Sequence, residues 1–218
     1  TPNNDCGITQ TFTITNTPAV VTIDNLDIST LSQTNCSPNN GSATVNEITI
    51  NGAGIGNTTG YTFTWLEDDV TTLIPGSRSL ATIGVQIGAG NYFVQSTNTA
   101  TNCKSPITPF TITDTHVDPV VAASATIDNT NCTGVTPNGS ITIEIDGAAP
   151  VAGEFDIEWF EGSGTSVTLG TTVGSVAGVN DETAQELSAG TYTVRVTDRL
   201  TPNNDCGITQ TFTITNTP

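Results

Sequence analysis

Five cysteines carry most of the chemistry that this sequence could perform: Cys6, Cys36, Cys103, Cys132 and Cys206. A structural zinc site is a poor use for them, because no pair has CxxC spacing and the chain contains a single histidine. The sequence is rich in Thr, acidic and poor in Lys, which favours disulfides formed in an oxidising, extracellular compartment.

Catalysis would need a general base, and the single histidine, His116, lies in a short Asp- and Pro-containing segment. Paired carboxylates such as Glu67 with Asp68, or Glu158 with Glu161, fall where strands should become turns. A solvated surface explains them better than the cleft of a glycosidase. We therefore expect no enzyme, no catalytic residue and no cofactor.

Two aspartates flank the same segment, Asp114 and Asp118, and carboxylate oxygens are ligands that Ca²⁺ prefers. Calcium at such a place could stiffen a connection between domains. Because no DxDxDG loop is present, calcium here is the weaker hypothesis, and no metal is the expectation.

The charge balance excludes several classes of protein. The 218 residues contain 21 acidic and 4 basic side chains, giving a net charge of -17. Four basic residues cannot neutralise a nucleic acid or bind an anionic membrane surface. No apolar run approaches the roughly 18 residues of a membrane span, and the first residues lack the features of a secretory signal. We expect the sequence to begin inside a mature protein.

Repeats organise the chain. Residues 1–18 and 201–218 are the same string, TPNNDCGITQTFTITNTP, so a longer polypeptide with a 200-residue period is expected. A weaker repeat of about half that length aligns NNGSATV (39–45) with PNGSITI (137–143), and GAGNYFVQSTN (88–98) with SAGTYTVRVTD (188–198). The predicted domains are therefore 19–117 and 118–218. Residues 1–18 would be the last strand of a preceding domain.

Each half contains about seven short segments in which apolar and polar residues alternate, separated by Gly and Asn turns. This pattern predicts an all-β protein of two tandem immunoglobulin-like antiparallel β-sandwiches. The expected core anchors are Trp65, Trp159, Tyr92 and Tyr192. Phe160 follows Trp159 directly, so strand alternation predicts that it faces outward.

The order NGSITIEIDG (138–147), FDIEWFEG (155–162), LSAGTYTVRVTD (187–198) and TQTFTIT (209–215) resembles the SprB-type repeats of large gliding-motility cell-surface adhesins. The first half shows the same order, with Ile87-Gly88-Ala89 in place of Leu-Ser-Ala. The resemblance implies a non-enzymatic stalk at the cell surface, exported by the type IX route and serving adhesion and gliding motility.

The pairing of the cysteines stays open between two arrangements. The repeat gives each complete domain two cysteines, with Cys6 belonging to the truncated neighbour, so Cys36–Cys103 and Cys132–Cys206 could form within domains. In a sandwich of immunoglobulin order, however, the two cysteines of one domain lie at opposite ends, about 20–30 Å apart, and a disulfide needs Cα atoms within about 7 Å. A Cys36–Cys206 bond across the junction is the alternative.

The leading functional hypothesis is a repeat segment of a long extracellular filament that holds an adhesive part away from the cell. Its expected partners are neighbouring repeats of the same chain, and beyond them other filaments, external surfaces or polysaccharides. One alternative is a polysaccharide-binding module, for which Phe160 would be the aromatic platform. Another is a pilus-like fibre of separate subunits. Nucleic acids and membranes are not expected partners.

Overall fold

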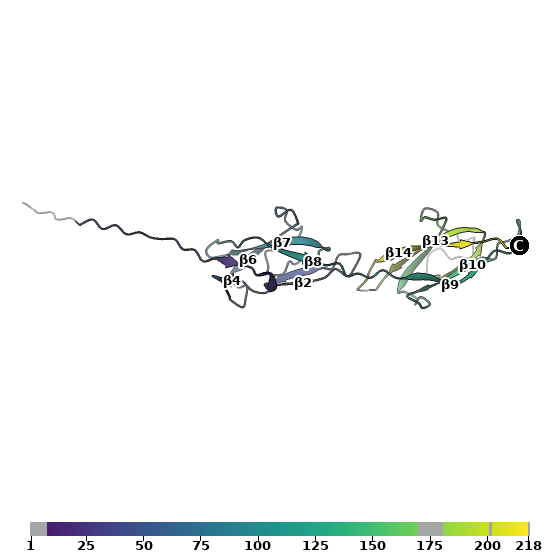
Figure 1. Ribbon diagram of the computed structural model, residues 1–218, viewed down its shortest axis with the longest axis horizontal. Coiled ribbons are helices and arrows are strands. Elements are labelled where there is room, and N and C mark those ends of the chain that lie inside the picture. Colours follow the sequence, from purple (N-terminus) through teal and green to yellow (C-terminus); the bar gives the residue numbers. More distant parts are fainter. Residues whose placement is uncertain (1–7, 170–180, 201, 218) are drawn as a thin grey trace, which may run out of the picture.

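The computed structural model describes residues 8–169, 181–200 and 202–217; the predicted disulfide residue Cys6 lies outside them. The described residues form two sheet-rich units that lie end to end, preceded by an extended segment (Figure 1). Each unit has its own hydrophobic core, and we name the units after them. The N-terminal unit is residues 21–112 and the C-terminal unit is residues 121–214.

The C-terminal unit is built from two antiparallel three-stranded sheets. One has the order β12-β10-β9, with bounds Thr183–Leu187, Gly139–Ile145 and Val121–Ile127. The other has the order β11-β13-β14, with bounds Phe155–Glu161, Gly190–Asp198 and Gly207–Ile214. Lettered as in the immunoglobulin fold, with the letter D left unassigned, these strands form the A-B-E and C-F-G sheets of an immunoglobulin-like sandwich.

Strand alternation builds this core. Along β10 the inward residues Ile141, Ile143 and Ile145 are at most 3% exposed, and β13 presents Val194 and Val196 to the same interior. Full burial of one such side chain stabilises the fold by about 1.5–3 kcal/mol. The outward positions of β10 are polar, so one face of the sheet is packed and the other is solvated.

The N-terminal unit repeats this plan with interruptions. Its larger sheet has the order β6-β7-β8, with bounds Tyr61–Leu66, Gly90–Asn98 and Thr108–Ile112. Opposite lie β2 (Ile28–Leu31) paired with β3 (Ser42–Val45), and a small sheet of β1 (Val21–Thr22), β4 (Thr49–Ile50) and β5 (Ala53–Gly54). The 3-10 turn η1 (Asn25–Asp27) separates β1 from β2, and Asp24 caps it by accepting from the amide of Leu26.

The aromatic anchors occupy matching places in the two units. Trp65 and Trp159 are 1% and 4% exposed, and each indole N–H donates to a backbone carbonyl, of Leu80 and Asp181 respectively. Tyr92 and Tyr192 are also buried. Their hydroxyls donate to the carbonyls four residues earlier, of Gly88 at 3.1 Å and Ser188 at 2.9 Å. A tyrosine that closes such a corner at the start of a strand is a feature of immunoglobulin-like sandwiches.

Phe160 lies outside the hydrophobic core of the C-terminal unit, as the prediction that it faces outward requires, but its ring is not open to solvent. Its side chain is 4% exposed although its neighbour Trp159 is also buried. Two features cover it: the chain after β11 folds back to form a bridge between Phe160 and Thr168, and the guanidinium of Arg195 lies 5.4 Å from the ring centroid. A cation over an aromatic face is attractive, so the outer surface of the sheet closes over this ring.

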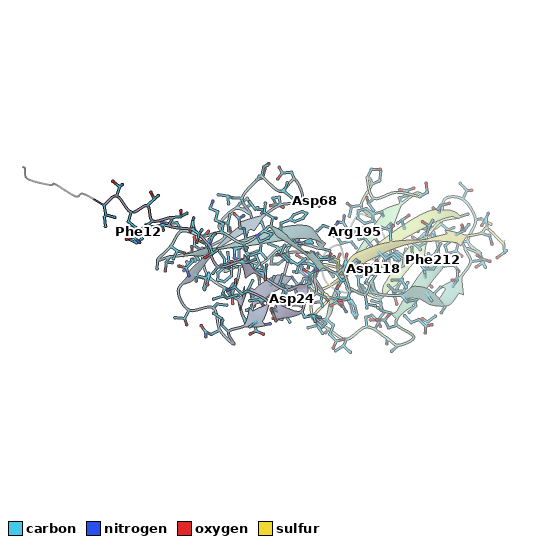
Figure 2. All side chains as sticks on the ribbon, turned by 60° about the vertical axis from the view of Figure 1, so that its left-hand side comes forward. Phe12, Asp24, Asp68, Asp118, Arg195 and Phe212 are labelled. Carbon is cyan, nitrogen blue, oxygen red and sulfur yellow. A yellow bond between two sulfur atoms is a disulfide. The ribbon has the colours of Figure 1, made fainter. Side chains whose placement is uncertain are left out.

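The described part of the first copy of the repeated string, residues 8–18, contains no strand. Phe12 and Ile14 are 78% and 95% exposed. Figure 2 shows Phe12 on the extended segment, away from the sheets, whereas its counterpart Phe212 lies within the C-terminal unit. That residues 1–18 complete a preceding domain stays a prediction.

Residues 113–120 connect the two cores and contain the predicted boundary between 117 and 118. Independent folding of residues 19–117 and 118–218 stays a prediction. Within the described ranges, no helix has the length and apolar character needed to cross a bilayer.

Candidate functional site

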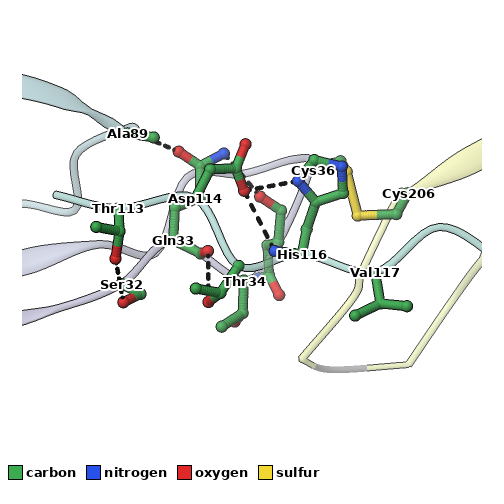
Figure 3. Close-up of polar contacts among 12 residues, drawn as sticks. Ser32, Gln33, Thr34, Cys36, Ala89, Thr113, Asp114, His116, Val117 and Cys206 are labelled. Atoms are coloured by element: carbon green, nitrogen blue, oxygen red, sulfur yellow. Dashed lines mark hydrogen bonds and ion pairs between the residues drawn. A yellow bond between two sulfur atoms is a disulfide. The ribbon is translucent and has the colours of Figure 1, made fainter.

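A disulfide joins the two units. Cys36 lies between β2 and β3 and Cys206 directly precedes β14, so the bond links positions 170 residues apart, with Cα atoms 4.9 Å from each other (Figure 3). This is the cross-junction pairing, one of the two that the sequence left open. Its presence fits an extracellular protein, because such bonds persist in oxidising compartments.

The strand order explains why these two cysteines meet. In the N-terminal unit, the connection from β2 to β3 lies at the same end as the C-terminal end of β8, where the linker begins. In the C-terminal unit, the connection from β13 to β14 lies at the end where β9 begins. Stacking the units end to end places these two connections against each other.

Backbone hydrogen bonds reinforce the disulfide. The carbonyl of Asn204 accepts from the amides of Cys36, at 3.0 Å, and Ser37, at 3.3 Å. The Asn204 side-chain amide donates back to the carbonyl of Ser37 at 2.7 Å. The amide of Val117 in the linker donates to Oδ1 of Asn203 at 3.1 Å. We call residues 202–206 the junction clasp, because they contact both the Cys36 loop and the linker.

The start of the linker is fixed to the N-terminal unit by Gln33. Its amide donates to the carbonyl of Thr113, and its carbonyl accepts from the amide of Thr115, both at 2.8 Å. The Gln33 side chain donates to the carbonyl of Asn35 at 2.9 Å and accepts from the amide of Ala89 at 2.5 Å (Figure 3). These bonds extend the sheet into the linker, so only the residues after Thr115 are left to span the junction.

His116 is the first residue of that span and lies between two carboxylates. Its Nδ1 lies 2.6 Å from Oδ1 of Asp114, and its Nε2 lies 3.8 Å from Oδ1 of Asp118. The hydrogen bond with Asp114 raises the pKa of His116 above its ordinary 6.5 and lowers the pKa of Asp114 below its ordinary 3.8. When His116 is protonated, it forms ion pairs with both carboxylates inside the linker, which favours one conformation of this segment.

The predicted calcium ligands Asp114 and Asp118 both face His116. The potential ligand atoms that lie within 4.8 Å of one another come from Cys36, His116, Asp118 and Cys206, a set that does not include Asp114. Sulfurs in a disulfide are not the thiolates that metals bind, and one carboxylate with a histidine is not the oxygen shell of Ca²⁺. That no metal binds here stays a prediction, and calcium stays the weaker hypothesis, which a shift of the thermal midpoint with Ca²⁺ would test.

The two remaining described cysteines are free thiols. Cys103 is half-buried between β7 and β8, at the end of the N-terminal unit that points away from the junction. Cys132 is exposed between β9 and β10, at the far end of the C-terminal unit. The within-domain pairs Cys36–Cys103 and Cys132–Cys206 are therefore not formed.

Three residues of the junction were missed in the sequence: Gln33, Asn203 and Asn204. The asparagine pair just before Cys206 was the available signal, because Asn often hydrogen-bonds backbone groups in loops. Nothing in the sequence pattern distinguishes Gln33 from other polar residues at the end of a strand.

The strand order and the two cores define an all-β protein of antiparallel sheets. No protein-family model matches the chain, and no curated protein shows significant similarity to it. A similar solved structure is that of three N-terminal domains of the bacteriophage RB49 Highly Immunogenic Outer Capsid protein (Hoc), at 17% identity and a TM-score of 0.40. The alignment covers 91% of this chain and spans 59% of the length of that one.

Proposed function

We propose that this chain is a structural repeat segment of a long extracellular filamentous adhesin, which projects from the cell surface and serves adhesion and gliding motility. The observation that carries the proposal is the disulfide from Cys36 to Cys206. A bond between two units with separate cores does not complete either core. Its direct effect is to fix one unit against the next, as a load-carrying rod requires.

The polar contacts at the junction support the same role. The clasp, the fixed start of the linker and the paired His116 all restrict bending between the units. The net charge of -17 keeps long chains solvated and apart from one another. These properties suit a spacer whose function is to keep its length.

The repeated string supports a longer array. Residues 207–214 form strand β14 and complete the sheet of the C-terminal unit, and residues 7–14 have the same sequence. A copy placed 200 residues earlier would complete an earlier unit of the same kind. Gliding motility and type IX export rest on the resemblance to SprB-type repeats alone. The partners of the segment are then neighbouring repeats first, and other filaments or external surfaces second.

Immunogold labelling of intact cells with antibodies against residues 118–218 tests this proposal. We expect label along filaments outside the cell and loss of surface attachment and gliding when the gene is disrupted. Label confined to the cell interior would overturn the proposal. Electrophoresis of the reduced, denatured native protein separates it from a pilus of separate subunits: one very large chain is expected, and a ladder of small subunits would contradict it.

The polysaccharide-binding alternative receives no support from Phe160, whose ring is buried. Among the described residues, Phe12 is the one aromatic side chain that is exposed to solvent, and it lies on the extended segment. A sugar platform would need aromatic faces open to solvent on a sheet or loop.

A further inference from the structure

We propose that Cys132 of one 200-residue period forms a disulfide with Cys103 of the next period, so that both kinds of junction in the array are covalently closed. The inference rests on the proposed tandem array. It assigns a partner to the two described cysteines that are free thiols in this chain. It is argued from the internal repeat, in which the Cys36–Cys206 bond serves as the template.

Cys103 is held in the same backbone turn as Cys206. The amide of Asn98 donates to the carbonyl of Cys103 at 2.9 Å, as the amide of Asp198 does to that of Cys206 at 2.7 Å. The residues preceding the two cysteines, Asn102 and Asp205, both have a φ of 58°.

The amides of Asn102 and Asp205 also donate to the backbone carbonyl at the start of the loop that contains them. Asn102 donates to the carbonyl of Asn98, and Asp205 donates to the carbonyl of Asp198. Non-glycine residues rarely take a positive φ, so this shared geometry is specific. Cys103 therefore has the backbone position of Cys206, at the end where the chain enters a unit, and its side chain lies at the edge of the N-terminal core.

Cys132 is likewise placed as Cys36 is. Two residues before Cys36, the amide of Thr34 donates to Oδ1 of Asn40 at 2.8 Å, and the Asn40 side chain donates back to the Thr34 hydroxyl. Two residues before Cys132, Thr130 and Asn138 make the same two bonds, the first also at 2.8 Å.

The strands on either side of these loops match as well. A parallel bridge from Gln33 to Asp114 ties the Cys36 loop to the exit of its unit, and a parallel bridge from Asn129 to Asn216 does so for Cys132. Cys132 therefore lies where the chain leaves a unit. It is exposed there, whereas Cys36 is partly covered by the junction.

The two free thiols lie at opposite ends of the chain and cannot pair within one copy. Cys103 is at the entry end of the N-terminal unit, and Cys132 is at the exit end of the C-terminal unit. Figure 1 shows the C-terminus at the end of the C-terminal unit that points away from the N-terminal unit. In a head-to-tail array this exit end of one period would face the entry end of the next. That meeting repeats the relation between Cys36 and Cys206 at the internal junction.

Linker lengths agree with this placement. Val20 and Val120 enter their units identically, because each donates its amide to a turn side chain, of Asn51 and Asp146 respectively, and accepts from the amide of that residue. Thr115 and Thr217 are counterparts at the exits of the two units, because their amides donate to the carbonyls of Gln33 and Asn129 respectively. Counted in the sequence, Val120 follows Thr115 by five positions, whereas Val20 follows Thr17, the copy of Thr217, by three. The junction between periods is therefore spanned by a shorter linker and should be closer.

The cysteine loop on the entry side is shorter to match. Cys103 follows Asn98 by five positions, whereas Cys206 follows Asp198 by eight. The junction between periods would have the shorter linker and the shorter Cys103 loop, and the internal junction has the longer linker and the longer Cys206 loop. At each junction the length of the loop therefore matches the length of the gap that it must cross. If each loop contacted only its own unit, its length would not be expected to change with the length of the linker.

The chemistry is ordinary thiol–disulfide exchange. The Cys132 and Cys103 thiols lose two protons and two electrons, and one S–S bond forms between them. A small disulfide such as oxidised glutathione accepts the two protons and two electrons. Its S–S bond breaks, and two thiols of the reagent are released. The geometric requirement is that the Cα atoms approach within about 7 Å, as at the internal junction.

A two-period chain tests the proposal: residues 1–218 followed directly by a second copy of 19–218. Cys6→Ser, Cys103→Ser in the first copy and Cys132→Ser in the second leave one candidate pair at the central junction. After oxidation with glutathione and isolation of the monomer, peptic peptides are mapped without reduction. We expect a Cys132–Cys103 peptide together with Cys36–Cys206 peptides, and disappearance of the former when Cys132→Ser is added to the first copy.

Thiols at Cys132 and Cys103 that remain open to alkylation, while Cys36–Cys206 is formed in both copies, would overturn the inference. The proposed function would survive that result if small-angle scattering still showed a rod nearly twice as long as one period. A two-period chain that folds back on itself would instead contradict the filament. As a second measurement, two forms of the 218-residue chain, both with Cys6→Ser and one with Cys103→Ser, the other with Cys132→Ser, are mixed under oxidation. Heterodimers should exceed the sum of the homodimers; equal yields would count against the pairing.

Discussion

Ile14 and Ile214 occupy the same place in two identical stretches of sequence, yet Ile14 is 95% exposed and Ile214 is 1% exposed. The two isoleucines differ in exposure because only one of the two stretches pairs with a neighbouring strand. Ile214 lies on β14, opposite Gly190 of β13, and contributes to the core of the C-terminal unit. The described residues around Ile14 pair with no strand. Among the described residues, the repeated sequence therefore forms a strand only where a neighbouring strand of a sheet pairs with it.

Ile214→Ala should lower the free energy of unfolding of the C-terminal unit by about 2–5 kcal/mol, because it removes a buried side chain and leaves a cavity. Ile14→Ala is the matched control, with the same neighbours in sequence and no core contact to lose. Its unfolding midpoint in denaturant should equal that of the unaltered chain. Equal losses in the two variants would contradict the structure.

Two glycines at matching positions leave no room for a side chain. A Cβ on Gly139 would lie 2.5 Å from the carbonyl oxygen of Leu187, and one on Gly41 would lie 2.7 Å from that of Ile87. Gly139→Ala and Gly41→Ala should each destabilise their own unit by about 1–3 kcal/mol, since the strands must move apart. Gly164→Ala, where nothing lies within 4 Å, is the control and should be close to neutral in thermal unfolding.

The pKa of His116 should exceed 6.5, and an NMR titration of the imidazole measures it without overlap because the chain has one histidine. Since folding raises this pKa, the stabilisation is complete below pH 6.5 and is lost as pH rises through the folded value. For Asp114, whose pKa is lowered, the stabilisation is present above pH 3.8 and is lost as pH falls through its folded value.

Asp114→Asn should bring the pKa of His116 back toward 6.5, because the hydrogen bond to a carboxylate is its main cause. Asp68→Asn, a change on an exposed residue of the turn after β6, provides the control. A His116 pKa that Asp114→Asn leaves unchanged would show that the linker is not braced by this pair.

Residues 19–117 and 118–218, produced separately, should each unfold in one cooperative transition. The reason is that each contains a complete core with its own buried tryptophan, Trp65 or Trp159. Tryptophan fluorescence during urea unfolding measures this, and the isolated cysteines are kept reduced. A half that shows no transition would contradict the predicted division into domains.

Much of the fold could be predicted because strand alternation is a local property. The inward sets around Ile141 and Val194 follow from a period of two, and the internal repeat alone is enough to align Tyr92 with Tyr192. Phe160 shows the limit of this reasoning. Its burial depends on Arg195 of another strand and on a loop that folds back, and a period of two contains neither.

The junction could be predicted only in part. Strand topology placed Cys36 and Cys206 at facing ends, but a longer first strand could have favoured Cys103 instead. The clasp made by Asn204 depends on the distance between two units, which no pattern within either unit specifies. The position of His116 in the linker was evident, whereas its contact with Asp114 depends on the local turn, which the spacing of the two residues does not specify.

Peptide mapping of the oxidised 218-residue chain, digested with pepsin at acidic pH to suppress disulfide exchange, tests the central claim most directly. The account predicts one peptide pair that joins Cys36 to Cys206 and disappears on reduction. Peptides that join Cys36 to Cys103, or Cys132 to Cys206, would place the bonds within domains and contradict the covalently braced junction.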